Sequence, residues 1–148
     1  MTVGTHVMQE VQITPEVRSI LAGIGKADVL VGIPSYNNAS TIGHVVRAVN
    51  AGLAKYFPDC RSVIVNSDGG SSDGTQDVVL QSQIHDYQTI LVQYPLYPIH
   101  KIVTPYHGIP GKGSAFRTIF RIAEELNVTA CAVLDSDLRS VPPEWMEL

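Results

Sequence analysis

The chain has 148 residues, 45% of them hydrophobic and 16% charged, and its formal net charge at pH 7 is -4. This composition is typical of one compact globular domain and argues against a large basic surface for nucleic acid. The sequence has no apolar run of membrane-spanning length and no leader pattern at its N-terminus, so we expect a cytoplasmic protein without a transmembrane segment. The two cysteines, Cys60 and Cys131, lie far apart and outside any CxxC pair, which favours two reduced thiols in the core over a zinc site.

Residues 1–27 are expected to form an N-terminal helical extension, ahead of a first strand at Asp28–Ile33. This β-branched run, ended by Pro34, is typical of a strand covered on both faces. A helix should follow the "SYNNAS" turn, with Asn38 or Ser40 as its N-cap. Its apolar residues recur at the spacing of one helical face: Ile42, Val45, Val46, Val49 and Leu53.

The second strand is expected at Arg61–Asn66 ("RSVIVN"). The loop "SDGGSSDGT" follows it, because its glycines permit positive φ, and a helix should begin near Thr75. A weaker strand is expected somewhere between Ile90 and Val103, where prolines obscure its limits.

The stretch "GIPGKGSAF" leads into a further helix, and Thr129–Leu134 ("TACAVL") has the pattern of a fully buried strand. The helix should pack through one apolar face: Phe116, Ile119, Phe120, Ala123 and Leu126. Strands that alternate with helices predict parallel βαβ units and a three-layer α/β/α, Rossmann-like, mainly parallel sheet. In such sheets the ligand lies beyond the carboxyl ends of the strands. The polar clusters after the first, second and fourth strands should therefore meet along one edge.

Asp135 and Asp137 directly follow the last of these strands. Carboxylates at i and i+2 can both reach a hard divalent cation such as Mg²⁺ or Mn²⁺, which removes their mutual repulsion. If the substrate carries a diphosphate, the cation bridges it and stabilises the charge of the departing group. The alternative is that Asp135 caps the following turn and Asp137 is simply solvated.

Lys112 stands between Gly111 and Gly113 at the mouth of the predicted helix. The stretch does not match a P-loop, because Gly113 follows the lysine where that motif has Ser or Thr. Backbone N–H groups and the helix dipole favour an anion at such a position, and Lys112 adds a positive charge. The alternative is an ordinary surface lysine in a flexible loop. Arg117, one turn into the helix, is a second candidate for phosphate or for a structural ion pair.

In the "SDGGSSDGT" loop, Asp68 at the strand end can accept hydrogen bonds from a nucleobase or ribose, while Asp73 and Thr75 organise the start of the helix. The alternative is a plain turn, for which Gly, Ser and Asp are well suited. His100 and His107 lie near the same edge, where surface or packing roles are the commoner ones.

The residues after the first strand can form the opposite wall of a nucleoside site. The main chain around Pro34 and Ser35, with the ring of Tyr36, can border the base. Asn37 and Asn38 either bond the base or hold the turn.

Four motifs occur in order along the chain: "VLVGIPSYNNASTIGHVV", "VIVNSDGGSSDGTQDVV", "GIPGKGSAFRTIFRIAEEL" and "AVLDSDLRSVPPEWMEL". Together they resemble the nucleotide-sugar-binding half of a GT-A glycosyltransferase of the family 2 kind. Within that fold, the sequence is most similar to the mannosylglycerate synthase and glucosyl-3-phosphoglycerate synthase group. That group has a similar "PGKG" before a helix and an Asp-x-Asp followed by Pro and an aromatic residue. The resemblance covers residues 28–148.

The resemblance implies transfer of a sugar from a UDP- or GDP-sugar to a small hydroxylated acceptor, such as glycerate or phosphoglycerate, with Mg²⁺ or Mn²⁺. It implies that Asp135 and Asp137 bind the metal and that they act in catalysis together with Lys112. The donor-binding residues that it implies are Pro34, Tyr36, Asn37, Asp68, Gly111, Lys112 and Ser136. Asn38 stands where many relatives have Glu, and "NSD" replaces the commoner paired aspartates, so the nucleotide preference stays open.

Members of this group extend well beyond the Asp-x-Asp pair. We therefore expect the chain to be a fragment of a longer enzyme, or to receive the remaining parts from elsewhere, and to transfer sugar poorly or not at all by itself. An incomplete sheet would expose an edge strand, which favours a homodimer.

Three other functions compete with this interpretation. A haloacid-dehalogenase phosphatase carries its Asp-x-Asp after the first strand, and a sugar-phosphate nucleotidyltransferase carries a glycine-rich signature there. This chain has "PSYNN" in that place. A non-catalytic nucleotide-binding or interaction module remains open.

Overall fold

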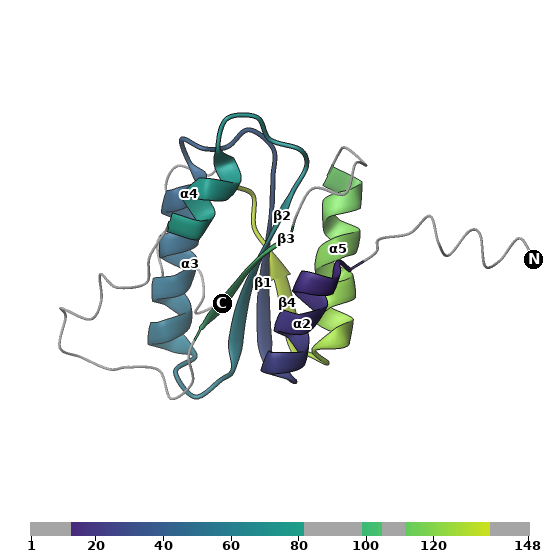
Figure 1. Cartoon of the computed structure of the whole chain (residues 1–148). Coiled ribbons are helices and arrows are strands. Elements are labelled where there is room, and N and C mark those ends of the chain that lie inside the picture. Colours follow the sequence, from purple (N-terminus) through teal and green to yellow (C-terminus); the bar gives the residue numbers. More distant parts are fainter. Residues whose placement is uncertain (1–12, 82–98, 105–111, 137–148) are drawn as a thin grey trace, which may run out of the picture.

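The computed structural model describes residues 13–81, 99–104 and 112–136 of the chain. Helices and strands alternate within these ranges (Figure 1). In chain order they are α2 (Pro15–Ile24), β1 (Val29–Ser35), α3 (Ile42–Tyr56), β2 (Ser62–Asp68), α4 (Thr75–Gln81), β3 (His100–Thr104), α5 (Lys112–Glu125) and β4 (Ala130–Val133). Three residues singled out in the sequence, His107, Gly111 and Asp137, lie outside the described ranges.

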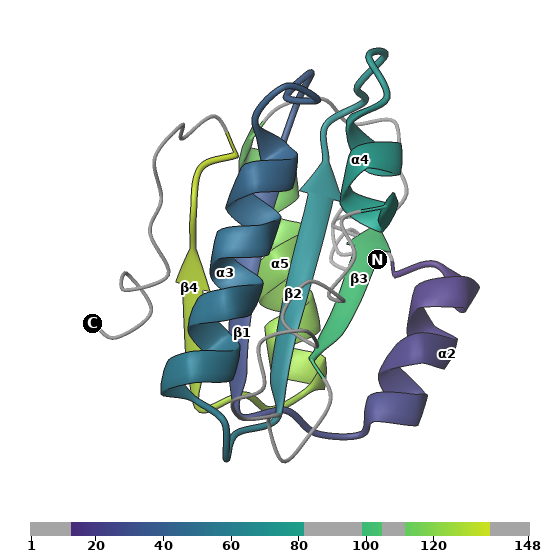
Figure 2. The ribbon, with the colours of Figure 1, turned by 90° about the vertical axis from the view of Figure 1, so that its left-hand side faces the viewer.

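The strands of the described residues form one parallel sheet in the order β3-β2-β1-β4. Figure 2 shows α3 in front of this sheet and α5 behind it. The predicted layered α/β fold with a parallel sheet is confirmed. The chain places β2 and β3 on one side of β1 and then returns to place β4 on the other side. The strand order thus reverses between β1 and β4, and in open parallel sheets ligands bind at such a switch point.

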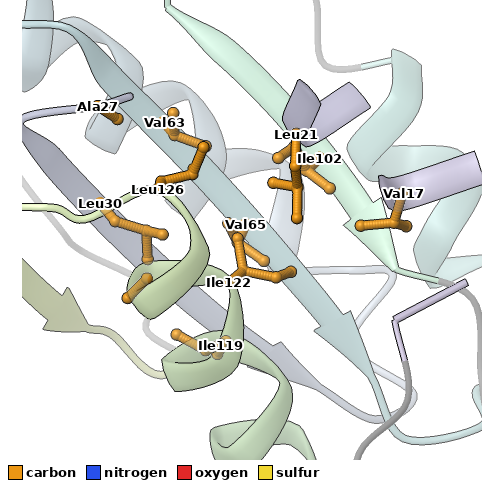
Figure 3. Packing of buried hydrophobic residues seen from close by; sticks show 11 residues of the cluster. Val17, Leu21, Ala27, Leu30, Val63, Val65, Ile102, Ile119, Ile122 and Leu126 are labelled. Carbon is orange, nitrogen blue, oxygen red and sulfur yellow. The ribbon is translucent and has the colours of Figure 1, made fainter. Parts of the chain in front are cut away.

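The strands direct alternate side chains to opposite faces of the sheet, and each face carries its own hydrophobic cluster. One cluster joins β1 and β2 to α3 and α4; its buried members are Val31, Ile33, Ile42, Val45, Val46, Ala48, Val49, Leu53, Ile64 and Val79. The other joins the sheet to α5 and α2 (Figure 3); its buried members are Val17, Leu21, Ala27, Leu30, Val63, Val65, Ile102, Ile119, Ile122, Ala123 and Leu126.

Helix α2 lies within residues 1–27, where the sequence predicts a helical extension. Its N-cap Thr14 accepts a hydrogen bond from Val17 N at 3.3 Å, and a proline occupies the first turn, where its missing N–H costs no helical bond. Its buried residues belong to the cluster against α5, so the helix is part of the core. No helix in the described ranges combines the length and the apolar character needed to cross a bilayer.

Helix α3 buries the apolar face that its periodicity predicts, including Ile42, Val45 and Leu53. Its N-cap is Thr41, so the prediction of Asn38 or Ser40 is wrong. The Thr41 side chain makes no capping hydrogen bond to the helix, and its hydroxyl donates to the carbonyl of Ser136.

Helix α5 packs closely on the sheet at Gly32 of β1. A Cβ added to Gly32 would lie 2.5 Å from Cγ2 of Ile119, far inside normal contact distance, so only glycine permits this packing. The predicted apolar face is wrong at Phe120, which is 51% exposed, whereas Ile122 is fully buried. Phe120 instead stacks on Phe116, with ring centroids 6.3 Å apart.

Strand β1 continues through Pro34 to Ser35, so the prediction that Pro34 ends it is wrong. Backbone groups of successive residues point to opposite sides of a strand. The carbonyl of Gly32 points toward β4, where it accepts from Leu134 N at 2.9 Å. The backbone nitrogen of Pro34, two residues on, therefore points to the same side. The last described β1–β4 pair is Gly32 with Val133, so the missing N–H of Pro34 removes no bond of that ladder. Strand β2 likewise runs past the predicted limit and ends at Asp68.

Strand β4 is exposed, although its sequence predicts a fully buried strand. Ala130, Cys131 and Ala132 are exposed and Val133 is half-buried. Within the described residues β4 pairs only with β1, which makes it an edge strand, and a short apolar run cannot distinguish an edge from a centre. The prediction of a core thiol at Cys131 is wrong for the same reason, and Cys60 is only partly buried; both thiols are free. The predicted homodimer stays a prediction.

Candidate functional site

The loops that follow β1 and β2 are bonded to each other at the carboxyl edge of the sheet. Gly69 N donates to Ser35 O at 2.7 Å, which extends the contact of the two strands by one residue. Farther out, Ser72 N donates to Asn37 Oδ1 at 2.8 Å, and Asn37 N donates to Ser71 Oγ at 2.7 Å. The two loops therefore form a single unit in which each fixes the other.

The four consecutive N–H groups of residues 36–39 all donate to side chains of these two loops. In chain order their acceptors are Asn38 Oδ1 at 2.8 Å, Ser71 Oγ at 2.7 Å, Thr75 Oγ1 at 2.9 Å and Asp73 Oδ2 at 3.1 Å. A loop that cradles phosphate needs such N–H groups to be directed at the ligand. Here they are already engaged, so the β1–α3 loop is not built as a phosphate cradle.

The carboxylate of Asp68 is buried and holds the β2–α4 loop in place. The residue is 4% exposed, and both of its carboxylate oxygens accept hydrogen bonds. Oδ1 accepts from the hydroxyls of Ser35 at 2.9 Å and Ser71 at 2.6 Å. Oδ2 accepts from the backbone N–H groups of Gly70 at 3.0 Å and Ser71 at 2.7 Å. The structure thus gives Asp68 an architectural role, and its predicted bond to a nucleoside stays a prediction.

Asn66 extends this polar network beneath the loops, a role that the sequence did not indicate. Its Nδ2 donates to Ile33 O at 3.0 Å and to Ser35 Oγ at 2.9 Å. Ser35 in turn donates to Asp68. An aspartate at position 66 would lack the N–H donor that makes both bonds, so the asparagine fits this arrangement.

Tyr36 presents an exposed aromatic ring beside the end of β2. It is 59% exposed. A Cβ added to Gly69 would lie 3.6 Å from Cδ1 of Tyr36, which places the ring over the first residue after β2. Pro34 is buried, so of these two side chains only that of Tyr36 is exposed. The predicted nucleoside border, formed by the main chain around Pro34 and Ser35 with the ring of Tyr36, stays a prediction.

The end of β4 reaches the same loops through Ser136. Ser136 is 5% exposed, and its Oγ donates to Asn38 Oδ1 at 2.6 Å. The hydroxyl of Thr41 donates to Ser136 O at 2.7 Å. The neighbouring Asp135 is exposed at this edge. The predicted meeting of three polar clusters is confirmed for the described residues, and Asn38, for which the sequence left a mere turn-holding role open, proves to be the residue that joins them.

Helix α5 begins at Lys112 at the same edge. Because α5 connects two parallel strands, its N-terminus lies where those strands end (Figure 1). Of the predicted residues, Pro34, Tyr36, Asn37, Asp68, Asp135 and Ser136 lie at this edge. For Lys112 the structure describes only its position at the start of α5.

Asp73, at the start of α4, has a pKa below its ordinary value of 3.8. Its pKa is lowered, chiefly by the hydrogen bond from the Thr75 hydroxyl and further by the backbone N–H groups of Ala39 and Thr75. These donors favour the charged carboxylate. Asp73 and Thr75 thus organise the start of α4, as the sequence predicts.

The described residues contain no cluster of three or more His, Cys, Asp or Glu side chains that could enclose a metal ion. Asp135 suits a different kind of site, in which one or two carboxylates hold Mg²⁺ and substrate phosphates complete its coordination. An exposed carboxylate at a switch point fits that donor set. The second carboxylate, Asp137, lies outside the described ranges.

No protein-family model matches the chain, and a search of curated proteins finds no match. Among solved structures, the chain is similar to the crystal structure of M. tuberculosis glucosyl-3-phosphoglycerate synthase, at 17% sequence identity and a TM-score of 0.45. The match covers 93% of this chain and 44% of that one, so the chain spans less than half the length of this solved structure. We draw no functional conclusion from a likeness at this level.

Proposed function

We propose that this chain is the donor-binding part of a metal-dependent glycosyltransferase. It would bind a UDP- or GDP-sugar whose glycosyl group passes to a small hydroxylated acceptor, for which glycerate and phosphoglycerate are the first candidates. One observation carries the proposal: Asn38 bonds both to Tyr36 and to Ser136, so an exposed aromatic ring and an exposed carboxylate flank one rigid loop at the switch point.

The Tyr36 side of the loop suits a nucleoside. An exposed ring offers a flat apolar face, and stacking of a base on an aromatic side chain is worth about 1–3 kcal/mol. The hydrogen bonds of the β1–α3 and β2–α4 loops fix the backbone that carries this ring before any ligand arrives. A ring carried on a fixed backbone loses less conformational entropy on binding than one on a loose loop.

The Asp135 side suits the diphosphate. The N–H groups of residues 36–39 are engaged within the protein, so the diphosphate needs another source of positive charge. We propose that the N-terminus of α5 with Lys112, and a divalent cation held by Asp135 and Asp137, provide it.

In the proposed reaction the bond between the sugar C1 and the diphosphate oxygen breaks as the oxygen of the acceptor hydroxyl bonds to C1, and the hydroxyl proton is released to solvent. Negative charge grows on the diphosphate while positive character develops at the sugar. A divalent cation, when bound, stabilises the charge of the leaving group as a Lewis acid. Of this chain's residues, Asp135 and Asp137 hold that cation, Lys112 adds positive charge at the start of α5, and Tyr36 keeps the nucleoside in place.

The site disfavours two of the competing functions. The phosphatase needs its carboxylates after the first strand, but in this chain Asp135 follows β4 and β1 ends in Ser35. The nucleotidyltransferase needs free N–H groups after the first strand, but those of residues 36–39 are engaged. A non-catalytic nucleotide-binding module shares the nucleoside and metal sites, and activity of the complete enzyme separates it from a transferase.

Thermal unfolding of the 148-residue chain with UDP, GDP and their sugars, each with and without Mn²⁺, tests the proposal. We expect a rise in the unfolding temperature that requires both nucleotide and metal. At a hundredfold excess over the dissociation constant, the ligand should add about 2.7 kcal/mol to the free energy of unfolding. Unchanged unfolding with all of these ligands, or hydrolysis of a phosphomonoester by the chain, would contradict the proposal.

A further inference from the structure

Ser136, the residue after Asp135, is fixed at two of its atoms by the β1–α3 loop. Its hydroxyl donates to Asn38 Oδ1 at 2.6 Å, and its carbonyl accepts from the Thr41 hydroxyl at 2.7 Å. Both contacts join residues almost a hundred positions apart in the chain, and Ser136 is 5% exposed. The exit of β4 is therefore anchored directly beside the exposed carboxylate of Asp135.

Thr41 makes this contact and does not cap its own helix. It is the N-cap residue of α3, a position where a threonine hydroxyl ordinarily accepts a hydrogen bond from the first turn. In this chain that capping bond is absent, and the hydroxyl donates to Ser136 O and, at 3.4 Å, to Asn38 O. A local rule of helix formation is broken where the β4 exit must be held, and such exceptions concentrate at functional sites.

Asn38 connects the β4 exit to both other loops. Its Oδ1 accepts from Ser136 Oγ and from Tyr36 N, and its own N–H donates to Thr75 Oγ1 at 2.9 Å. One amide oxygen thus lies between the backbone that carries the exposed ring of Tyr36 and the residue that follows Asp135.

We propose that Asn38 and Thr41 are positioning residues, which hold Asp135 ready for a divalent cation and couple cation binding to nucleotide binding. The proposal rests on the function proposed above. A carboxylate on an anchored segment loses less conformational freedom when it binds a cation than one on a loose segment. Because Asn38 bonds to both sides, a nucleotide that settles on Tyr36 should raise the affinity for the cation, and the cation should raise the affinity for the nucleotide by the same factor.

Calorimetric titration of the 148-residue chain with Mn²⁺, in the absence and presence of UDP or GDP, tests the proposal without any measurement of activity. In Asn38→Ala we expect Mn²⁺ affinity to fall about tenfold, because the variant loses the side-chain hydrogen bonds that hold Ser136 and Tyr36 in place. The factor by which nucleotide improves Mn²⁺ affinity should shrink in the same variant. Asn38→Asp keeps an acceptor oxygen, so Mn²⁺ should bind it at least as tightly as it binds the wild type.

Thr41 provides a second pair of variants in case Asn38→Ala fails to fold. Thr41→Val removes the donor at nearly constant volume and should weaken Mn²⁺ binding about threefold, whereas Thr41→Ser keeps the hydroxyl and should restore it. Ser40→Ala is the matched control, because Ser40 is exposed in the same loop and has no side-chain hydrogen bond among the described contacts. Its Mn²⁺ affinity should equal that of the wild type.

The outcomes separate the two proposals. If the wild type binds no Mn²⁺ with or without nucleotide, the proposed function fails and this inference fails with it. If the wild type binds Mn²⁺ and nucleotide together, but Asn38→Ala and Thr41→Val bind Mn²⁺ as the wild type does, the positioning role alone is overturned. Faster hydrogen exchange at the amides of Asp135 and Ser136 in folded Asn38→Ala, together with weaker Mn²⁺ binding, supports it.

Discussion

The exits of β1 and β2 and the exit of β4 lie at one edge of the sheet but use their polar residues differently. After β1, Asn37 bonds to the β2–α4 loop, and after β2, Asp68 bonds to Ser35 at the end of β1, so the edge is built from such side chains. After β4, Asp135 is exposed and the next residue makes the bonds that anchor the segment. The comparison teaches that a carboxylate at a strand end is either built into the loops, as Asp68 is, or left exposed, as Asp135 is.

Helix α5, whose N-terminus lies at the same edge, is positioned differently from the paired loops. Helix α5 is seated by apolar packing on β1 and β2, with Ile119 against the bare backbone of Gly32. Hydrogen bonds shape the paired loops and anchor the β4 exit, while packing on the sheet places α5. The following predictions test that contrast.

The largest effect on stability is expected when the buried carboxylate, Asp68, is replaced by alanine, in comparison with the exposed carboxylate, Asp135. Asp68→Ala removes the acceptors of four hydrogen bonds and leaves a buried donor on Ser35 and partly buried donors on Ser71, so it should lower the free energy of unfolding by about 3 kcal/mol. Asp135→Ala, the matched control at the same edge, should lower it by about 1 kcal/mol or less. Urea denaturation measures both. Equal losses would erase the distinction between the regions.

The next largest effect concerns ligand binding. Asp135→Asn should remove the Mn²⁺-dependent part of nucleotide stabilisation, which amounts to about 2.7 kcal/mol at a hundredfold excess of ligand, while it leaves the unliganded protein nearly as stable as before. Asp137→Asn should have the same effect if both carboxylates hold the cation. Thermal unfolding with and without Mn²⁺ measures it. Persistence of the full metal-dependent shift in both variants would show that the metal lies elsewhere.

A moderate effect is expected where packing places α5. Gly32→Ala forces a Cβ into Ile119 and should cost about 2 kcal/mol of stability. Gly23→Ala is the matched control, since a Cβ there meets nothing within 4 Å and alanine favours the helix. In a double-mutant cycle, Ile119→Val should relieve part of the cost of Gly32→Ala. Fully additive losses would mean that this contact does not limit how closely α5 approaches.

The smallest effect is a dependence of stability on pH through Asp73. Because its pKa is lowered below 3.8 in the folded state, its contribution is fully present above that value and is lost as pH falls through the folded pKa. Asp73→Asn removes this ionisation, so the loss of stability from about pH 6 to about pH 3 should be slightly smaller in the variant. Urea midpoints across that range measure the difference. A steeper loss in the variant would contradict the assigned direction.

The sequence predicts the fold well because its elements carry their own local pattern. The apolar spacing from Ile42 to Leu53 gives α3, and the β-branched runs give β1 and β2 close to their observed limits. It fails where the outcome depends on neighbours that are distant in the chain. The run in β4 has the composition of a buried strand but lies at an edge, and Phe120 continues an apolar stripe that the sheet does not cover.

The candidate site divides in the same way. The motifs indicate which strand ends carry polar residues, and Asp135, Tyr36 and Asp68 do lie at one edge. They do not indicate that Asp68 is enclosed by donors or that Asn38 joins three loops, since those bonds connect residues separated by up to 98 positions.

The amino-acid sequence by itself determined the alternation of strands and helices, and with it a parallel sheet whose polar loops share an edge, because periodicity and turn residues act over a few neighbouring positions. Only the tertiary structure decided that β4 lies beside β1, that Asp68 is buried while Asp135 is exposed, and that Ser136 bonds to Asn38 and Thr41. Strand order and burial arise from contacts between distant segments. A local pattern is compatible with several such arrangements, and packing of the whole chain selects one.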